Sequence, residues 1–273
     1  MLQPSLTLNN GHRMPQVGFG LWQVPQEETP RVVAEALQLG YRLVDGAAIY
    51  GNERGLGEGL RRSGLPRDQL FVTTKVWNDR QGYDTTLTAV ENSLGRLGLD
   101  WLDLCLIHWP VPSRNLFVDT WRALIRLRDE GRVRSIGVSN FRAEDLDRLV
   151  SETGVIPALN QVELHPRLQQ AHLREKHEDL GIVTQSWTPL GRGRSFDDPC
   201  IASIARRLGQ SPAQVILRWH LQLGCSVIPR SIHKERLAEN LDLFDFALTA
   251  EDMADIARLD TGERTGPDPA TFE

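Results

Sequence analysis

Three short apolar runs in this chain end in an acid or a base, and a tyrosine follows the first of them. Asp45 follows "RLV", Tyr50 comes five positions later, Lys75 ends "FVTTK", and His108 ends "LCLIH". Each residue alone has an ordinary explanation, since an Asp-Gly pair is common in turns and single lysines or histidines are usually structural. Together they could perform acid–base chemistry.

A tyrosine needs help to act as an acid, because its pKa is near 10. A buried ammonium within about 4–6 Å of a tyrosine favours its phenolate form. Burial by itself would lower the pKa of the lysine and favour its neutral form. We therefore expect Lys75 to lower the pKa of Tyr50 and Asp45 to keep Lys75 charged. Tyr50 would then give its proton to an oxygen that gains negative charge, and His108 would orient that oxygen.

Polar or aromatic residues also end the other apolar runs. They are Trp22, Trp77, Trp109, Ser139, Asn140, Gln161, Glu163, Trp187, Arg230 and Ser231. Polar and aromatic residues at the ends of all these runs are harder to explain by structural roles than any one of them alone. Their recurrence predicts that they meet at a single site.

The elements that must position these residues are strands alternating with amphipathic helices. The expected strands are 16–20, 42–45, 70–75, 102–108, 133–139, 158–164, 181–187 and 224–229. The expected helices are 28–39, 52–62, 84–98, 118–130, 143–152, 169–179, 198–208, 211–222, 233–242 and 250–259. For example, Leu87, Val90, Leu94 and Leu97 form one helical face.

Alternation of this kind specifies a parallel sheet, either open and doubly wound or closed as a (β/α)8 TIM barrel. Eight strands without a linker favour the barrel, as one domain over residues 1–273. A small hairpin about Asn10-Gly11 is expected before the first barrel strand, with extra helices and a C-terminal loop. The strand ends would then meet at one mouth, where barrel active sites lie.

Composition excludes several other classes of protein. The net charge of -5 argues against a nucleic-acid surface, and no signal peptide or membrane-spanning run is recognisable, so we expect a cytoplasmic protein. Three cysteines without CxxC spacing are expected to be reduced thiols. There is no zinc motif, GxSxG elbow or Walker loop, so no metal is expected. "GLGEG" (55–59) does not fit the Rossmann fingerprint.

Seven short motifs are spread along the chain in a fixed order: "DGAAIYGNE" (45–53), "TTKVW" (73–77), "LIHWP" (106–110), "SIGVSNF" (135–141), "NQVELHP" (160–166), "SWTPLGRG" (186–193) and "IPRSIHKERLAEN" (228–240). Through these motifs the sequence resembles the aldo-keto reductases along essentially its whole length, and is most similar to the bacterial branch of 2,5-diketo-gluconate reductases. The resemblance implies a barrel, NADPH-dependent carbonyl reduction, and Asp45, Tyr50, Lys75 and His108 as the catalytic tetrad.

The same resemblance implies an NADP(H) site. Ser139, Asn140 and Gln161 would hold the nicotinamide carboxamide, and Trp187 would stack on the ring. Arg230, Ser231 and Arg236 would bind the 2′-phosphate, which suits guanidinium groups in an otherwise acidic chain. The remaining expected cofactor contacts are Trp22, Leu190, Ile232, Glu239 and Asn240.

Trp22, Trp77, His108 and Trp109 are expected, beside Tyr50, to form an apolar substrate pocket, with the tail 264–273 folded over it. This pocket suits small aldehydes, α-dicarbonyls and ketones, and the family branch adds keto-sugar acids. We expect a monomer that acts on small carbonyl molecules, with no nucleic-acid or membrane partner. The alternative is a non-catalytic barrel that binds NADPH as a redox sensor.

Three departures from the family pattern affect these expectations. Gly46 stands where threonine is usual, which removes a hydroxyl and should loosen the backbone beside Asp45. Arg230 and His233 replace the more common lysine and small or basic residue, although NADPH is still expected over NADH. The loop from Arg192 to Pro199 is short, which predicts no large belt over the pyrophosphate and faster cofactor exchange.

Overall fold

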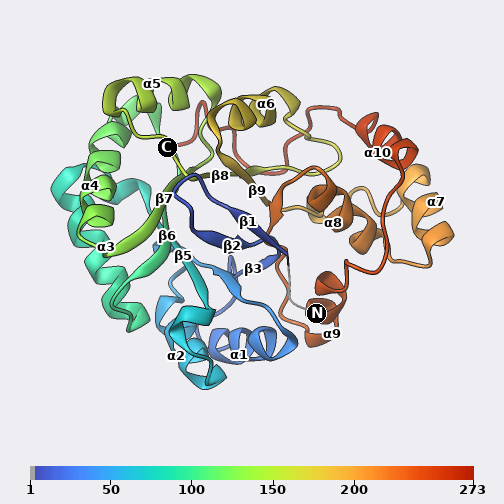
Figure 1. The fold of residues 1–273 in the computed structure, drawn as a ribbon, viewed down its shortest axis with the longest axis horizontal. Coiled ribbons are helices and arrows are strands. Elements are labelled where there is room, and N and C mark those ends of the chain that lie inside the picture. Colours follow the sequence, from blue (N-terminus) through green and yellow to red (C-terminus); the bar gives the residue numbers. More distant parts are fainter. Residues whose placement is uncertain (1–3) are drawn as a thin grey trace.

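An eight-stranded parallel sheet forms the centre of the computed structural model, which describes residues 4–273 (Figure 1). Its strands are β3 (Gly18–Gly20), β4 (Leu43–Asp45), β5 (Phe71–Val76), β6 (Leu102–Ile107), β7 (Val133–Ser139), β8 (Leu159–Glu163), β9 (Val183–Trp187) and β10 (Ser226–Val227). Each strand pairs with the next in chain order, and a parallel bridge between Val17 and Val227 joins the two edges. The predicted barrel is therefore confirmed over the open sheet.

Helices surround this barrel (Figure 1). They are α1 (Thr29–Leu39), α2 (Glu53–Ser63), α3 (Tyr83–Leu97), α4 (Phe117–Asp129), α5 (Ala143–Thr153), α6 (Ala171–Leu180), α7 (Pro199–Leu208), α8 (Pro212–Gln222), α9 (Lys234–Leu241) and α10 (Ala250–Ala257). All ten lie within a few residues of their expected ranges. Local signals explain such agreement: Ser211 and Gln214 cap α8 reciprocally, with Pro212 at its first position.

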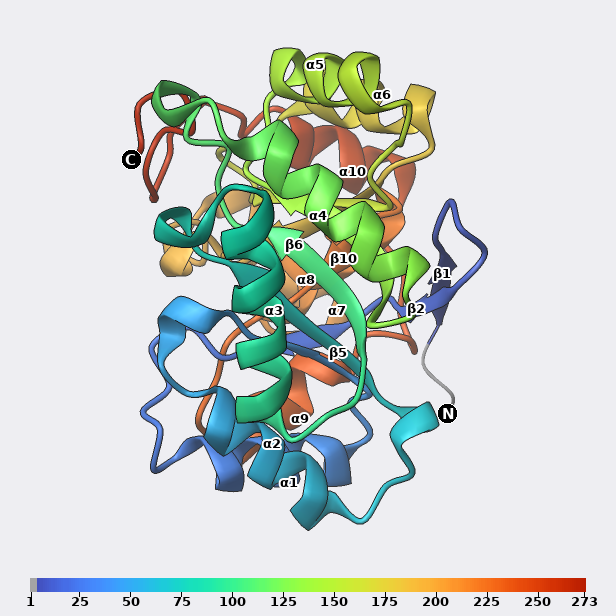
Figure 2. The ribbon, with the colours of Figure 1, turned by 90° about the vertical axis from the view of Figure 1, so that its left-hand side faces the viewer.

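The N-terminal hairpin covers the amino end of the barrel. Strands β1 (Ser5–Thr7) and β2 (Arg13–Pro15) pair antiparallel, and the connecting Gly11 has a φ of 86°. Leu8 and Met14 of this hairpin are buried against interior side chains of the barrel such as Leu43 and Leu104. Figure 2 shows the hairpin and the C-terminal tail at opposite ends of the molecule. The carboxyl end of the strands, which we call the mouth, is thus left for polar groups.

Candidate active site

A buried ion pair links the ends of two neighbouring strands at the mouth. Asp45 is the last residue of β4, Lys75 lies in β5, and each side chain is at most 2% exposed. Lys75 Nζ donates to Asp45 Oδ2 at 2.6 Å and to the carbonyl oxygen of Gly46 at 2.8 Å. Gln161 of β8 donates to the other carboxylate oxygen at 2.8 Å. Parallel pairing of β4 with β5 brings these residues together across 30 positions of sequence.

Tyr50 and His108 complete the predicted group. Tyr50 ends the short 3-10 helix η1 (Ala48–Tyr50) after β4, and His108 directly follows β6. Lys75 Nζ lies 5.2 Å from the centroid of the Tyr50 ring, and the Tyr50 and His108 ring centroids are 5.9 Å apart. His108 Nδ1 is buried and has no hydrogen-bond partner among residues 4–273. The four expected tetrad residues therefore form one cluster.

The expected direction of the tyrosine pKa shift is wrong for this structure. Burial, and secondly the charge of Asp45, raise the pKa of Tyr50 well above its usual value. Lys75 directs its hydrogen bonds to Asp45 and Gly46, which compensates part of its charge, and the remaining charge does not outweigh the burial of the phenol. Burial also lowers the pKa of Lys75, against the opposing effect of Asp45. Tyr50 therefore holds its proton firmly.

His108 is a neutral group in this environment. Burial, and secondly the charge of Lys75, lower its pKa well below the usual value for histidine. Trp77 packs edge-on against its ring at a centroid distance of 4.9 Å. A neutral imidazole can still donate one hydrogen bond from its protonated nitrogen. The cluster thus offers a protonated phenol and an imidazole side by side.

Hydroxyl and amide groups continue the site along β7 and β8. Ser139, Asn140 and Gln161 are buried, and Asn140 Nδ2 donates to Ser139 Oγ at 3.1 Å. Trp187, half-buried at the end of β9, donates from Nε1 to Asn140 Oδ1 at 2.8 Å. An aromatic face beside buried amides is the chemistry that a ring bearing a carboxamide requires. These residues therefore fit the nicotinamide end of NADP(H).

The segment after β10 carries two exposed arginines. Arg230 and Arg236 are exposed, and Arg230 Nη2 donates to the carbonyl oxygen of Gln23 at 3.2 Å. Of the other expected contacts, Ser231 and Asn240 are buried and Leu190, Ile232 and Glu239 are half-buried. Arg236 lies on α9, so both arginines belong to the segment that follows β10.

Three indoles follow the carboxyl ends of β3, β5 and β6, and two of them, Trp77 and Trp109, pack against His108. Trp109 is buried, Trp77 is half-buried and Trp22 is 44% exposed. Phe272 of the C-terminal tail lies 4.4 Å from Trp109 and 6.2 Å from Trp77, measured between ring centroids. The expectation that the tail folds over the mouth is thus confirmed, and the tail adds an aromatic wall.

Two departures from the family pattern have visible consequences. Gly46 N donates to Thr73 O at 2.9 Å and Gly46 O accepts from Lys75 Nζ at 2.8 Å, so both backbone polar groups of this residue are hydrogen-bonded beside Asp45. The loop before α7 is short, as expected, and the guanidinium carbon of Arg192 lies 5.9 Å from the Trp22 ring centroid. A single side-chain contact therefore joins the loop after β9 to the loop after β3.

Two residues near the site had no assigned role from sequence. Glu163 was recognisable only as a polar residue at a strand end, and its partners Thr265 and Gly266 are more than 100 positions away. Phe272 carried no signal at all, because a terminal aromatic residue has no periodic pattern around it. Within residues 4–273, no cluster of three or more potential metal ligands occurs. Among the same residues, no helix is long and apolar enough to cross a membrane.

Comparison with known proteins gives matches along nearly the whole chain. The model of the aldo/keto reductase family matches residues 16–261. An aldo-keto reductase of Mycolicibacterium smegmatis is 56% identical over 99% of this chain and 98% of its own. Methylglyoxal reductase DkgA of Yersinia pestis is 46% identical over 99% of this chain and 98% of its own. A crystal structure of a point variant of Gox0644 in complex with NADPH is 51% identical, with a TM-score of 0.96 over 99% of both chains.

Proposed function

The chain belongs to the aldo/keto reductase family, and we propose that it uses NADPH to reduce small aldehydes, ketones and α-dicarbonyls to alcohols, with keto-sugar acids as further candidates. It is an NADP(H)-dependent oxidoreductase acting on carbonyl substrates. The observation that carries the proposal is the buried Lys75–Asp45 pair beside the Tyr50 ring. A structural ion pair alone would not need a phenol and a neutral imidazole at the same mouth.

The proposed proton donor is Tyr50. Because its pKa is raised, the phenol keeps its proton until a nearby oxygen becomes basic enough to take it. When bound, NADPH supplies the hydride for the carbonyl carbon. Tyr50 gives its proton to the carbonyl oxygen, and Lys75 then stabilises the phenolate that this transfer leaves. Together these events convert the carbonyl into an alcohol.

His108 would orient the substrate carbonyl. The ring is neutral and lies between Tyr50 and Trp77, so it can donate a hydrogen bond to the same oxygen that Tyr50 protonates. Trp22, Trp77 and Trp109 would form the apolar walls, with Phe272 as a fourth aromatic group.

The cofactor assignments follow the same logic. Ser139, Asn140 and Gln161 would hold the carboxamide, and Trp187 would face the ring. Arg230, Ser231 and Arg236 would bind the 2′-phosphate, with Trp22, Leu190, Ile232, Glu239 and Asn240 as further contacts. We expect the barrel to work as one domain and as a monomer, because all of these residues come from a single chain.

The test is turnover of NADPH with methylglyoxal, an aromatic aldehyde and a diketo-gluconate, compared between the wild type and Tyr50→Phe. We expect the wild type to consume NADPH and Tyr50→Phe to lose at least about a hundredfold in kcat, in line with general acid catalysis. NADPH binding, followed by fluorescence, should be unchanged. Equal rates for the two proteins would refute the role of Tyr50. Tight NADPH binding without turnover of any carbonyl would favour the redox-sensor alternative.

A further inference from the structure

A second buried carboxylate lies at the mouth and takes no part in the proposed chemistry. Glu163 is the last residue of β8 and is 1% exposed. Its Oε1 accepts from Thr265 N and Thr265 Oγ1, both at 2.6 Å. Gly266 N donates to both carboxylate oxygens at 3.2 Å, and His165 Nε2 lies 3.2 Å from Oε1. A buried carboxylate is stable only with such partners.

These contacts keep Glu163 ionised. Burial by itself raises the pKa of this carboxyl, but the hydrogen bonds from His165 and Thr265 outweigh it and hold the pKa below its usual value. Arg264 Nη1 adds positive charge 3.9 Å from Oε2. Hydrogen bonds to an ionised acceptor are about twice as strong as those between neutral groups. Glu163 is therefore a firm attachment point for the tail.

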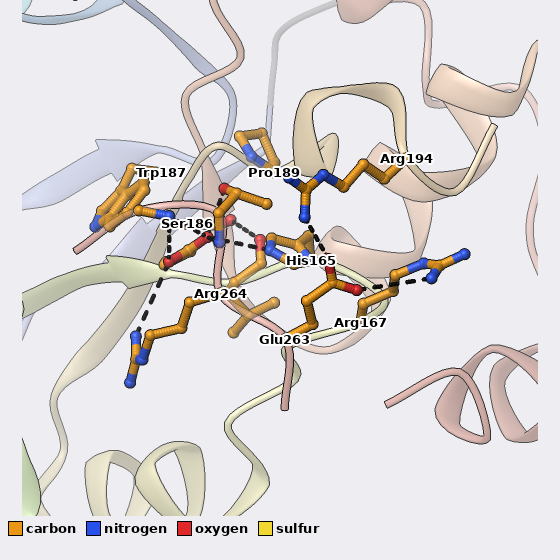
Figure 3. Close-up of polar contacts among 12 residues, drawn as sticks. His165, Arg167, Ser186, Trp187, Pro189, Arg194, Glu263 and Arg264 are labelled. Atoms are coloured by element: carbon orange, nitrogen blue, oxygen red, sulfur yellow. Dashed lines mark hydrogen bonds and ion pairs between the residues drawn. The ribbon is translucent and has the colours of Figure 1, made fainter. Parts of the chain in front are cut away.

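The tail is attached to the barrel at neighbouring points as well (Figure 3). Glu263 pairs with Arg194 of the loop after β9 and lies 3.7 Å from Arg167 of the connection after β8. The amide of Glu263 also donates to the carbonyl oxygen of Arg167 at 3.1 Å. The exposed pairs contribute little on their own, so the buried carboxylate is the main anchor.

Gly266 connects this anchor to the indole of Trp187. A Cβ atom at position 266 would lie 3.1 Å from Trp187 Cζ3 and 2.5 Å from Cη2, and the second distance is shorter than any that real Cβ atoms show. The tail backbone therefore rests directly on the six-membered ring of the indole. The indole is also held by a hydrogen bond, because Trp187 Nε1 donates to Asn140 Oδ1. Gly266 and the side-chain amide of Asn140 together define the orientation of the indole ring.

The same tail carries Phe272 into the substrate pocket. The amides of Thr271 and Phe272 both donate to the carbonyl oxygen of Asp268, at 3.1 and 3.0 Å, which folds the last residues into a turn. This turn places Phe272 against Trp109 only six positions after Gly266. A contact that fixes the position of Gly266 therefore also restricts the position of Phe272.

We propose that Glu163 is a positioning residue that clamps Thr265 and Gly266 and thereby sets both the cofactor-facing orientation of Trp187 and the substrate-facing position of Phe272. The inference rests on the proposed function, since it assigns Trp187 to the nicotinamide and Phe272 to the substrate. One buried carboxylate would then govern affinity for both molecules without touching either.

The decisive variant is Glu163→Gln, which keeps the side-chain volume but turns an NH2 group toward the donors of the tail. Loss of buried hydrogen bonds to an ionised group predicts an increase of about tenfold in the Kd for NADPH and in the KM for an aromatic aldehyde. In the protein without cofactor, trypsin should cleave after Arg264 faster than in the wild type. Glu152→Gln, in an exposed ion pair on α5, is the matched control and should change none of these values.

Double-mutant cycles separate positioning from general destabilisation. In a Trp187→Phe background, Glu163→Gln should no longer raise the NADPH Kd. In a Phe272→Ala background, it should no longer raise the KM of the aldehyde. Effects that persist in these backgrounds, or a lower melting temperature with unchanged Kd and KM, would overturn the proposal.

Two further measurements keep the test decisive. If Glu163→Gln does not fold, Thr265→Val removes only the hydroxyl contact and should change Kd and KM in the same direction by a smaller factor; unchanged values would overturn the clamp. The NADPH Kd and the tryptic cleavage need no turnover. Failure of the proposed reaction, read from carbonyl turnover and Tyr50→Phe, is therefore distinguishable from failure of the clamp.

Discussion

Removal of the buried ammonium by Lys75→Met should destabilise the fold as well as abolish turnover. Methionine has nearly the same length but no charge, so Asp45 would keep only Gln161 as a side-chain partner, at 2.8 Å. The Asp45 carboxylate is 2% exposed and cannot recruit bulk water in place of the lysine. A carboxylate without its counter-charge would remain in the barrel interior.

Breaking a buried ion pair by removing one partner costs about 3–5 kcal/mol, because the remaining charge is uncompensated. At about 2–4 °C per kcal/mol for a domain of this size, the melting temperature should fall by roughly 6–20 °C. The double variant Asp45→Asn with Lys75→Met has no buried charge at this point. Its free energy of unfolding should return to within about 2 kcal/mol of the wild type, since neutral replacement of a whole pair is often tolerated.

The assay is urea unfolding of the wild type, both single variants and the double variant, followed by circular dichroism. All three variants should be inactive, so stability is an independent readout of the pair. A Lys75→Met protein as stable as the wild type would refute the assignment of Lys75 as the compensating charge. Strictly additive losses in the double variant would refute the coupling of Asp45 with Lys75.

Three further perturbations test other parts of the structure. Gly57→Ala should lower the free energy of unfolding by about 1–3 kcal/mol, because the new Cβ would lie 2.1 Å from Leu97 O. The control Gly95→Ala, whose Cβ would have no atom within 4 Å, should leave the free energy of unfolding unchanged or raise it. Equal effects of the two variants would contradict the close packing of α2 on α3. Burial lowers the pKa of His177 to about 4, so between pH 6.5 and 4 the unfolded chain binds one proton more than the folded chain. The free energy of unfolding should therefore fall on acidification by roughly 1 kcal/mol per pH unit in this range. His177→Gln should flatten that slope in urea titrations, and an unchanged slope would show that His177 does not cause it. Arg236→Ala should raise the Kd for NADPH about tenfold and leave that for NADH unchanged, as measured by fluorescence titration; equal losses for both cofactors would place Arg236 away from the 2′-phosphate.

Much of the fold was predictable because its signals are local. Apolar runs, helical periodicity and capping residues such as Ser211 act over a few neighbouring positions, so all eight barrel strands and ten helices lie close to their expected ranges. The cluster of Asp45, Tyr50, Lys75 and His108 was also predictable. Parallel strands bring their carboxyl ends to one face, so strand-end residues must meet there.

The electrostatics of the site depended on tertiary structure. Sequence suggested that Lys75 would lower the pKa of Tyr50, but the sign depends on depth of burial and on where the ammonium directs its hydrogen bonds. In the structure those bonds go to Asp45 and Gly46, and burial dominates the phenol. Neither the depth of burial of Tyr50 nor the choice of hydrogen-bond acceptors by Lys75 can be read from residues that are neighbours in the chain.

Contacts between distant segments are the other part that only the folded chain decided. The sequence by itself determined that a polar residue, Glu163, ends a barrel strand and that a tail follows the last helix. It did not determine that this carboxylate would bind Thr265 and Gly266, or that Phe272 would lie on Trp109. Such pairings are selected by shape and by the need to satisfy buried charge once the barrel has closed, and no periodicity in the sequence encodes them.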